Sequence, residues 1–340
     1  MRAIILAEGK LGVFTAKTAT CIIRYRTDEV LAVIDSSKAG ATVGQHLNVG
    51  GDIPIVSSVG ETLDMKPDTL ILGIAPPGGG LPKEFRGHIL DAVKAGMNVL
   101  SGLHVFLNDD PEISAAAAEA GVTLTDLRQV PEKLPIGQNL ARETKCLRVL
   151  TTGTDCNVGK MVAAWEIAAE LRRRGRDAEF IATGQTGMIL SGAGMALDRM
   201  ISDFVSGAAE KLVLDNAGHE ILIFEGQGTL QHPSYSGVTL SLLHGVAPQA
   251  IVLVHHATRK LINNYEIPIL PLAEQVKLYE YIAGLVNGAK VVGIALNCAD
   301  MDEKSTLEAV ESAKKETGLP VTDVIRFGTG CIVDALEELL

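Results

Sequence analysis

The sequence is poor in aromatic residues and has no surplus of basic ones. Phenylalanine, tryptophan and tyrosine together make up 4% of the 340 residues, and lysine plus arginine number 30 against 41 acidic residues. The net charge of −11 argues against a general nucleic-acid binder, which needs a basic face for the phosphates. A small anionic substrate stays compatible with this charge, because a local basic pocket can exist on an acidic protein.

Cysteine is also scarce, and its spacing argues against a disulfide framework or a zinc site built on cysteine pairs. The cysteines are Cys21, Cys146, Cys156, Cys298 and Cys331. No two of them have the close spacing of a metal-ligand pair, and their number is odd. We therefore expect reduced thiols in a cytoplasmic protein and no bound metal.

Long hydrophobic runs are absent as well. No uncharged apolar run reaches the roughly 18 residues that a membrane-spanning helix requires. The stretch MRAIILAEGK is only briefly apolar and continues into Glu8 and Lys10, which favours a first strand over a signal peptide. We expect neither a membrane segment nor a nucleic-acid partner, and the 47% of hydrophobic residues favours a packed core and a homo-oligomer.

What the sequence does contain is an alternation of short apolar runs with stretches of helical periodicity. Up to about residue 125, buried-strand patterns occur at RAIILA, EVLAVID, TLILGIA and MNVLSGL, and helical stretches at EFRGHILDAVKAG and SAAAAEAG. This βαβ order predicts a doubly wound, Rossmann-like sheet. The polar stretch 126–145 carries two prolines and marks a boundary between a first domain, 1–130, and a second, 131–340.

The alternation resumes at CLRVLTTG and continues to the end of the chain. Strand patterns follow at AEFIATG, EILIFEG, AIVLVHH, KVVGIALNC and VTDVIRFG, with clear helical stretches at AEQVKLYEYIAGLVNG and DEKSTLEAVESAKKETG. We therefore predict an α/β protein with two mostly parallel, doubly wound sheets. Ligands of such sheets bind outside the carboxyl ends of the strands, so the residues after each strand are the candidates for function.

The segment TTGTDCNVGKM, residues 151–161, has the composition of a phosphate-binding loop. It lies between a predicted strand and a predicted helix at about 159–174, as that motif requires. Its glycines allow N–H groups to converge on an anion, and the helix N-terminus and Lys160 add positive charge. The residues that we assign to ligand binding here are Gly153, Thr154, Asp155, Cys156, Asn157, Val158, Gly159, Lys160 and Met161.

The residue after the loop lysine departs from the usual motif. A serine or threonine normally ligates Mg²⁺ at this position, whereas Met161 offers a soft thioether that does not suit that ion. Asp155 and Glu225 remain as alternative metal ligands. The simplest hypothesis is that the loop holds a diphosphate whose charge is met by Lys160 and backbone N–H groups. The 3′-phospho-ADP part of coenzyme A is such a ligand.

The loop GTDCNVGK resembles that of dethiobiotin synthetase and its relatives, with five residues between Gly153 and Gly159. The sequence EGQG follows a hydrophobic strand and is similar to the EGxG of the same enzymes, which implies that Glu225 lies near phosphates and metal. By this resemblance, Asn297 reads the nucleotide base, unless it is a plain turn residue at the end of a strand. A ligase or kinase that uses ATP with Mg²⁺ is therefore the alternative to an enzyme that binds coenzyme A.

Over nearly its whole length the chain resembles the D-glutamate N-acetyltransferase family. The stretches that carry the resemblance are AKTATCIIRY, AVIDSSKAG, ILGIAPPGGGLP, AGMNVLSGLHVFL, GTDCNVGK, TGQTGMI, SDFVSGAAE, FEGQGTLQHPSYSGVTL and LPVTDVIRFG. The resemblance implies a Rossmann-like domain joined to a P-loop domain, and acetyl transfer from acetyl-CoA to D-glutamate in its catabolism. The first domain is also similar in layout to the coenzyme A-binding domain of succinyl-CoA synthetase, which leaves open which domain holds the nucleotide.

N-acetylation needs a base for the substrate ammonium, donors for the thioester oxyanion and cations for the substrate carboxylates. The candidate catalytic residues are Glu225 after EILIF, His255 and His256 after IVLV, His232 in the loop after EGQG, and Gln185 in ATGQTG. A hydrogen-bonded structural role is the alternative for each histidine. The candidate carboxylate-binding residues are Arg259 and Arg199.

Two other interpretations concern the same loop. A helix N-terminus favours a reactive thiolate, so Cys156 is a candidate for an acyl-cysteine intermediate as well as a small loop residue without chemistry. A protein that senses a nucleotide without turnover is a third functional class beside the acetyltransferase and the ligase. Tight binding with no product from any substrate would distinguish that class.

Overall fold

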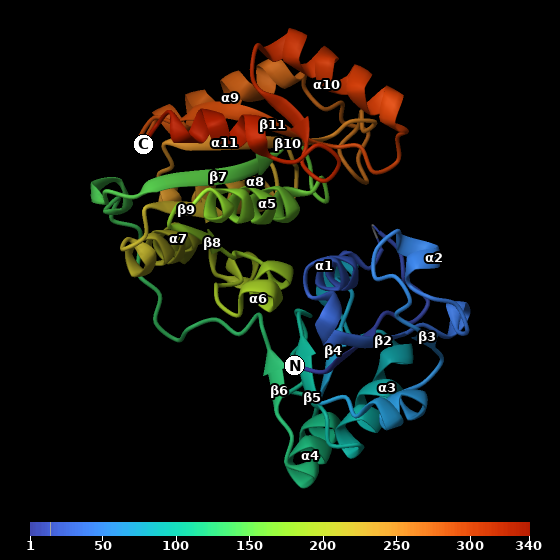
Figure 1. Ribbon diagram of the computed structural model, residues 1–340. Coiled ribbons are helices and arrows are strands. Elements are labelled where there is room, and N and C mark those ends of the chain that lie inside the picture. Colours follow the sequence, from blue (N-terminus) through green and yellow to red (C-terminus); the bar gives the residue numbers. More distant parts are fainter. Residues whose placement is uncertain (14) are drawn as a thin grey trace. The chain divides into compact units, whose positions relative to one another are not determined.

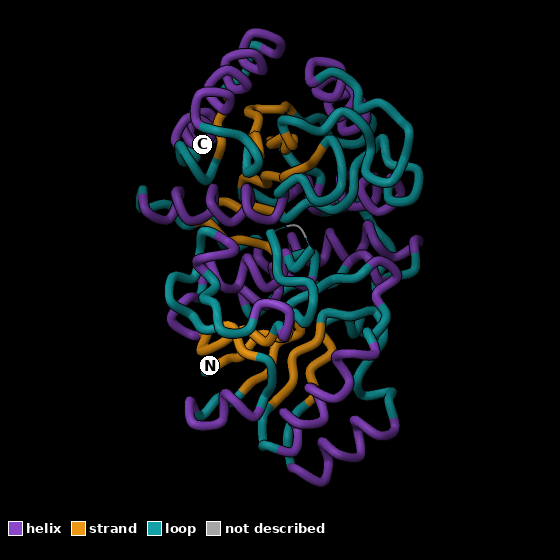
Figure 2. The backbone as a smooth tube through the Cα atoms, turned by 90° about the vertical axis from the view of Figure 1, so that its right-hand side faces the viewer, coloured by secondary structure: helices purple, strands orange, loops and turns teal. Residues whose placement is uncertain are grey.

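The computed structural model describes residues 1–13 and 15–340 and divides the chain into two compact units. One unit comprises Met1–Gln129 and Met188–Gly192, and the other comprises Val130–Gly187 and Ala193–Leu340. Each unit contains a six-stranded sheet with helices on its faces (Figures 1 and 2). The predicted α/β class with two doubly wound sheets is confirmed.

The first sheet has the strand order β3-β2-β1-β4-β5-β6, and all its pairings are parallel. Its strands are β1 (Ala3–Leu6), β2 (Val30–Ile34), β3 (Ile55–Val56), β4 (Thr69–Leu72), β5 (Asn98–Ser101) and β6 (Leu124–Asp126). The α-helices are α1 (Lys17–Tyr25), α2 (Gly44–Leu47), α3 (Lys83–Lys94) and α4 (Pro111–Ala120). Short 3-10 helices lie at η1 (Thr27–Glu29), η2 (Ser36–Lys38), η3 (Gly60–Met65) and η4 (Pro77–Gly79).

This strand order is the one found in Rossmann-like sheets, with the reversal between β1 and β4. All four residues of β1 are buried, because α1 covers one face of the sheet and α3 and α4 the other (Figure 1). Strands covered on both faces are apolar throughout, which is why AIIL and TLIL could be recognised in the sequence.

The second sheet has the order β12-β11-β10-β7-β9-β8 and is also parallel throughout. Its strands are β7 (Leu147–Gly153), β8 (Ala178–Ile181), β9 (Ile221–Phe224), β10 (Ala250–His256), β11 (Lys290–Asn297) and β12 (Val321–Asp323). The helices are α5 (Lys160–Arg173), α6 (Gln185–Ser191), α7 (Ser202–Asn216), α8 (Ser236–Val246), α9 (Leu272–Gly284), α10 (Glu303–Thr317) and α11 (Gly330–Glu337). The 3-10 helices η5 (Ala141–Glu143) and η6 (Leu197–Arg199) complete it.

The strand order of this sheet reverses at its central strand, β7, which lies between β10 and β9. Every residue of β7 is buried. In open α/β sheets the point of reversal is where ligands bind, at the carboxyl end of the strands. The phosphate-loop motif therefore starts at the topological position that such sheets use for binding. Among the residues that the structure describes, no helix is both long enough and apolar enough to cross a membrane.

Candidate functional site

The loop that connects β7 to α5 has the tight geometry of a phosphate-binding loop. Gly153 ends β7 and α5 begins at Lys160. A Cβ atom on Gly153 would lie 2.9 Å from Cγ2 of Val158 and 3.1 Å from Cδ of Lys160, so a larger residue would push the loop open. Gly159 has a φ of 110°, a conformation that glycine adopts readily. The glycines predicted from the motif are thus required by the backbone.

Lys160 is buried beside the loop that it serves. Its Nζ donates a hydrogen bond of 2.7 Å to the carbonyl oxygen of Asp155. The start of the loop is held by Tyr279 of α9, whose hydroxyl donates to the carbonyl oxygen of Gly153 at 2.9 Å. Burial raises the pKa of Tyr279, so its hydroxyl stays protonated and remains a donor. This role could not be predicted from the sequence, because Tyr279 lies in an apolar stretch of a helix like any core residue.

The Asp155 carboxylate is fully buried, and groups of the protein itself already balance its negative charge. Its Oδ1 accepts a hydrogen bond of 2.7 Å from the N–H of Cys156. Its Oδ2 accepts from Nη1 of Arg259 at 3.0 Å and from the N–H of Asn263 at 2.7 Å. Arg259, which we predicted to bind a substrate carboxylate, therefore lies at the loop and pairs with the loop's own aspartate.

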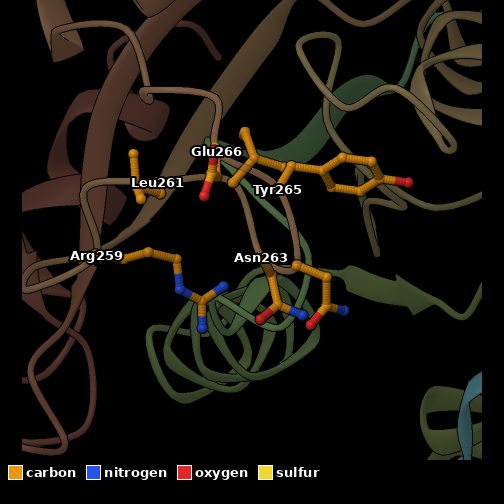
Figure 3. A pocket seen from close by; sticks show the side chains of 7 residues that line it. Arg259, Leu261, Asn263, Tyr265 and Glu266 are labelled. Carbon is orange, nitrogen blue, oxygen red and sulfur yellow. The ribbon is translucent and has the colours of Figure 1, made fainter.

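Arg259 belongs to a hairpin-like segment, 259–269, that lies against the loop. The segment is held by an antiparallel bridge between Leu261 and Pro268. Residues 259 and 261–266 line an open depression of about 420 Å³, and Figure 3 shows Arg259 and Asn263 extending to the same side of it. Arg259 and Asn263 both donate hydrogen bonds to Asp155, and these bonds hold the segment against the loop.

His232, predicted as a base, lies beside the loop but is arranged as a donor. It is 3% exposed, and its ring lies 4.5 Å from that of Tyr235 and 5.2 Å from that of Tyr265. Its Nδ1 accepts a hydrogen bond of 3.1 Å from the N–H of Ser234. Burial lowers the pKa of His232, so the ring is neutral at pH 7. With Nδ1 as the acceptor, the proton of the neutral ring lies on Nε2, which then donates.

Three side chains that could ligate a metal ion, those of Asp155, Cys156 and His232, lie together at one corner of the loop. Ligand atoms of Asp155, Cys156 and His232 all lie within 4.8 Å of one another, a donor set of the kind that zinc accepts. Two cations are next to it, since Arg259 pairs with Asp155 and Lys160 donates to the Asp155 carbonyl. The charge balance of this corner therefore favours an anion over a metal ion.

Two histidines end β10, on the side of the loop. Nδ1 of His255 is hydrogen-bonded to Oγ1 of Thr154 over 2.8 Å. Burial, together with the charges of His256 and Arg259, lowers the pKa of His255 to about 4. His256 is 5% exposed and burial lowers its pKa as well. Both rings are therefore neutral at physiological pH, and neutral imidazoles can accept protons.

Asn297, at the end of β11, lies close to the loop. Its Nδ2 is 3.7 Å from the position that a Cβ atom would take on Gly159. Its Oδ1 accepts a hydrogen bond of 3.2 Å from the N–H of Ala299, which stabilises a turn. The turn role and the predicted base-reading role are thus both compatible with its position.

Glu225 follows β9 directly and is buried, as expected. Its Oε2 accepts hydrogen bonds of 3.2 Å from the N–H groups of Thr183 and Gly184, so its charge stabilises the turn between β8 and α6. Gln185 opens α6 and is also buried. Arg199, the second candidate for a substrate carboxylate, ends η6 and is exposed. Glu225 is not part of the cluster of Asp155, Cys156 and His232.

Gly226, the second residue of EGQG, allows β9 to approach the loop. A Cβ atom here would lie 1.7 Å from the carbonyl oxygen of Thr151 and 3.3 Å from Cδ of Lys160. Its N–H donates to Oγ1 of Thr151 at 3.0 Å. The glycine thus brings the end of β9 against β7 and next to the loop lysine.

Asp35 of the first unit occupies the position where Rossmann domains carry a ribose-binding acid, immediately after β2. Its carboxylate accepts hydrogen bonds from the N–H groups of Gly9, at 3.1 Å, and Leu11, at 3.0 Å. It also accepts one from the N–H of Ser37 at 3.1 Å. Asp35 is therefore occupied in holding the connection after β1, and the second unit offers the better-formed phosphate site.

Comparison with known families gives the same two parts. Residues 36–130 match the N-terminal Rossmann-like domain of a family described as a domain of unknown function, DUF1611. Residues 135–333 match its C-terminal P-loop domain. The chain belongs to the DUF1611 family. The predicted combination of a Rossmann-like and a P-loop domain is therefore confirmed.

Relatives within and near this family cover almost the whole chain. A D-glutamate N-acetyltransferase from Tritonibacter scottomollicae is 36% identical over 328 residues, which is 95% of each chain. One from a Pseudoalteromonas species is 35% identical over 319 residues, 93% of each chain. The crystal structure of a DUF1611 protein from Anabaena variabilis ATCC 29413 is 40% identical and superposes with a TM-score of 0.94 over 99% of both chains. The predicted family resemblance is confirmed.

Proposed function

We propose that this DUF1611 protein is an N-acetyltransferase that moves an acetyl group from acetyl-CoA to the amine of D-glutamate, in the catabolism of that amino acid. The observation that carries the proposal is the similarity to two enzymes named D-glutamate N-acetyltransferase, at 36% and 35% identity over 95% and 93% of this chain. The anion-binding character of the loop supports it, because both acetyl-CoA and D-glutamate are anionic.

The residues of the loop fit the phosphates of coenzyme A. Gly153 and Gly159 allow the tight turn, α5 presents its N-terminus, and Lys160 is held beside the loop. Asn297, near Gly159, is the proposed contact to the adenine base. Acetyl-CoA supplies the activated thioester, and the protein has to position it, remove a proton from the substrate ammonium and stabilise the oxyanion.

Of the two histidines that end β10, His256 is the proposed proton acceptor. The hydroxyl of Thr258 donates to Oδ2 of Asp300 at 2.8 Å, so it can only accept from Nδ1 of His256, 3.3 Å away. The lone pair of His256 then lies on Nε2, which suits a base. The deprotonated amine attacks the acetyl carbon, the bond to the coenzyme A sulfur breaks, and the thiolate leaves and takes up a proton. The products are an N-acetyl amino acid and coenzyme A.

The alternative is a ligase that uses ATP with Mg²⁺, which the form of the loop favours. The residues at the positions expected to ligate Mg²⁺ are poorly suited to that ion. Met161 follows the lysine, and the Glu225 carboxylate accepts the N–H groups of Thr183 and Gly184. Hard oxygen ligands are what Mg²⁺ requires. We therefore rank the acetyltransferase first.

Replacement of the loop lysine tests the proposal. We expect Lys160→Ala to reduce kcat/KM for acetyl-CoA by at least about tenfold, because a charged contact to phosphate contributes roughly 1.5–3 kcal/mol. Lys304→Ala, at an exposed site on α10, is the matched control and should behave as wild type. Formation of N-acetyl-D-glutamate is followed by mass spectrometry. Wild-type protein that makes no N-acetyl-D-glutamate from acetyl-CoA would contradict the proposal.

A further inference from the structure

We propose that the loop binds the diphosphate of coenzyme A without any metal ion, and that His232 donates a hydrogen bond to it through Nε2. The inference rests on the proposed use of acetyl-CoA. It adds a specificity-determining residue, His232, and a class of ligand: a nucleoside diphosphate bound free of Mg²⁺. Three features of the loop's surroundings support it.

The first feature is that the positions expected to hold a metal are unsuited to it. Met161 replaces the hydroxyl residue that ligates Mg²⁺. The Oδ2 atom of Asp155 is paired with Arg259, and its Oδ1 accepts the N–H of Cys156. A divalent cation at this carboxylate would have to displace Arg259 or lie beside its positive charge. The loop therefore meets phosphate charge with protein cations.

The second feature is a donor on a largely buried ring beside the loop. The His232 ring is 3% exposed and neutral, and its Nδ1 is occupied by the N–H of Ser234. Among residues 1–13 and 15–340, no hydrogen-bond acceptor is found for the Nε2 proton. With Nδ1 occupied, the Nε2 N–H is left to donate to an acceptor outside the described residues, such as a bound ligand. A phosphate oxygen is an acceptor of this kind.

The third feature is how the ring is held. The side chain lies against Tyr235 on one side and edge-on to Tyr265 on another, with ring centroids 4.5 and 5.2 Å away. The hydroxyl of Tyr265 is hydrogen-bonded to Oγ of Ser234 over 2.6 Å. The ring is thereby fixed within 4.8 Å of the ligand atoms of Asp155 and Cys156. A donor held in this way needs no reorganisation to meet the ligand.

Calorimetric binding of coenzyme A to the full chain at pH 7.5 tests the inference, once with EDTA and once with Mg²⁺. We expect the wild-type Kd to agree within about twofold between the two conditions. His232→Ala should weaken binding by about ten- to a hundredfold, as loss of a hydrogen bond to a charged group predicts. His232→Gln, which retains an N–H donor, should recover part of this loss.

His219→Ala is the matched control, because His219 is a partly exposed histidine that precedes β9 and pairs with Asp177 instead. Its Kd should equal that of the wild type. A wild-type Kd that requires Mg²⁺, or unchanged binding by both His232 variants, would overturn the inference. Formation of N-acetyl-D-glutamate is measured separately, so a failure of this inference leaves the proposed activity standing, and loss of that activity leaves metal-free binding intact. Thermal melting of each variant verifies that it is folded.

Discussion

At the scale of single residues, the loop is controlled by groups whose partners come from distant parts of the sequence. Asp155 is joined to Arg259 and Asn263, more than 100 positions away. The carbonyl oxygen of Gly153 likewise accepts a hydrogen bond from the hydroxyl of the remote Tyr279. The sequence motif identified the loop itself. It could not identify these partners, because a hydrogen bond between remote segments leaves no spacing pattern.

The role of Cys156 can be decided at this scale. In the proposed reaction the amine attacks the thioester directly, so the Cys156 thiol takes no part in the chemistry. We expect Cys156→Ser to retain at least about a third of wild-type kcat, because serine has nearly the same volume. Mass spectrometry of wild-type protein after incubation with acetyl-CoA alone provides the second readout, and an acetylated Cys156 in that sample would contradict the account.

The buried histidine His255 predicts a pH dependence of stability. Its folded pKa of about 4 lies below the usual 6.5, so between these values the unfolded chain binds a proton that the folded chain does not. The stability is therefore complete above about pH 6.5 and is lost as the pH falls towards 4. For this group alone the loss between pH 7.5 and 5 is about 2 kcal/mol.

Urea unfolding of wild type and His255→Asn at pH 7.5 and pH 5 measures this contribution. The free energy of unfolding of the variant should fall by about 2 kcal/mol less than that of the wild type. His219→Asn, at a partly exposed histidine, should keep the wild-type dependence. Equal falls for wild type and His255→Asn would show that His255 does not resist protonation.

At the scale of elements, the strands were easier to predict than the helices. Strands such as β9 and β10 are buried on both faces, so they stand out as nearly continuous apolar runs. Helices α7 and α8 were not singled out in the sequence, because glycines inside their apolar pattern weaken a helical prediction, although close packing requires them. A Cβ atom on Gly207 would lie 1.9 Å from the carbonyl oxygen of Pro135, and one on Gly245 would lie 2.2 Å from that of Ser206.

The approach of β9 to β7 yields a prediction about Gly226. Because a Cβ atom there would overlap the Thr151 carbonyl, we expect Gly226→Ala to lower the free energy of unfolding by more than about 3 kcal/mol. Gly237→Ala is the matched control, since Gly237 lies in α8 with open space around it, and its effect should stay within about 1 kcal/mol. Urea unfolding monitored by circular dichroism gives both values. A Gly226→Ala protein as stable as the wild type would mean that the two strands are not this close.

At the scale of the whole molecule, the sequence predicted the class, the two sheets and the loop. The site chemistry was less accessible. His232 was predicted as a base, and its environment makes it a donor, since Ser234 occupies Nδ1. Glu225 was predicted near a metal, and its carboxylate accepts two backbone N–H groups from the neighbouring strand end. The type of a residue and its place after a strand can be read from sequence, whereas the lone pair or proton that it presents depends on its neighbours.

The measurement that tests the central claim most directly is a paired turnover assay on purified protein of defined metal content. One arm supplies acetyl-CoA with D-glutamate or L-glutamate and follows the release of free thiol. The other supplies ATP with Mg²⁺ and follows ADP and phosphate. The account predicts thiol release that depends on D-glutamate, persists in EDTA and falls sharply in Lys160→Ala. Formation of ADP without thiol release would contradict it and would make the protein a ligase.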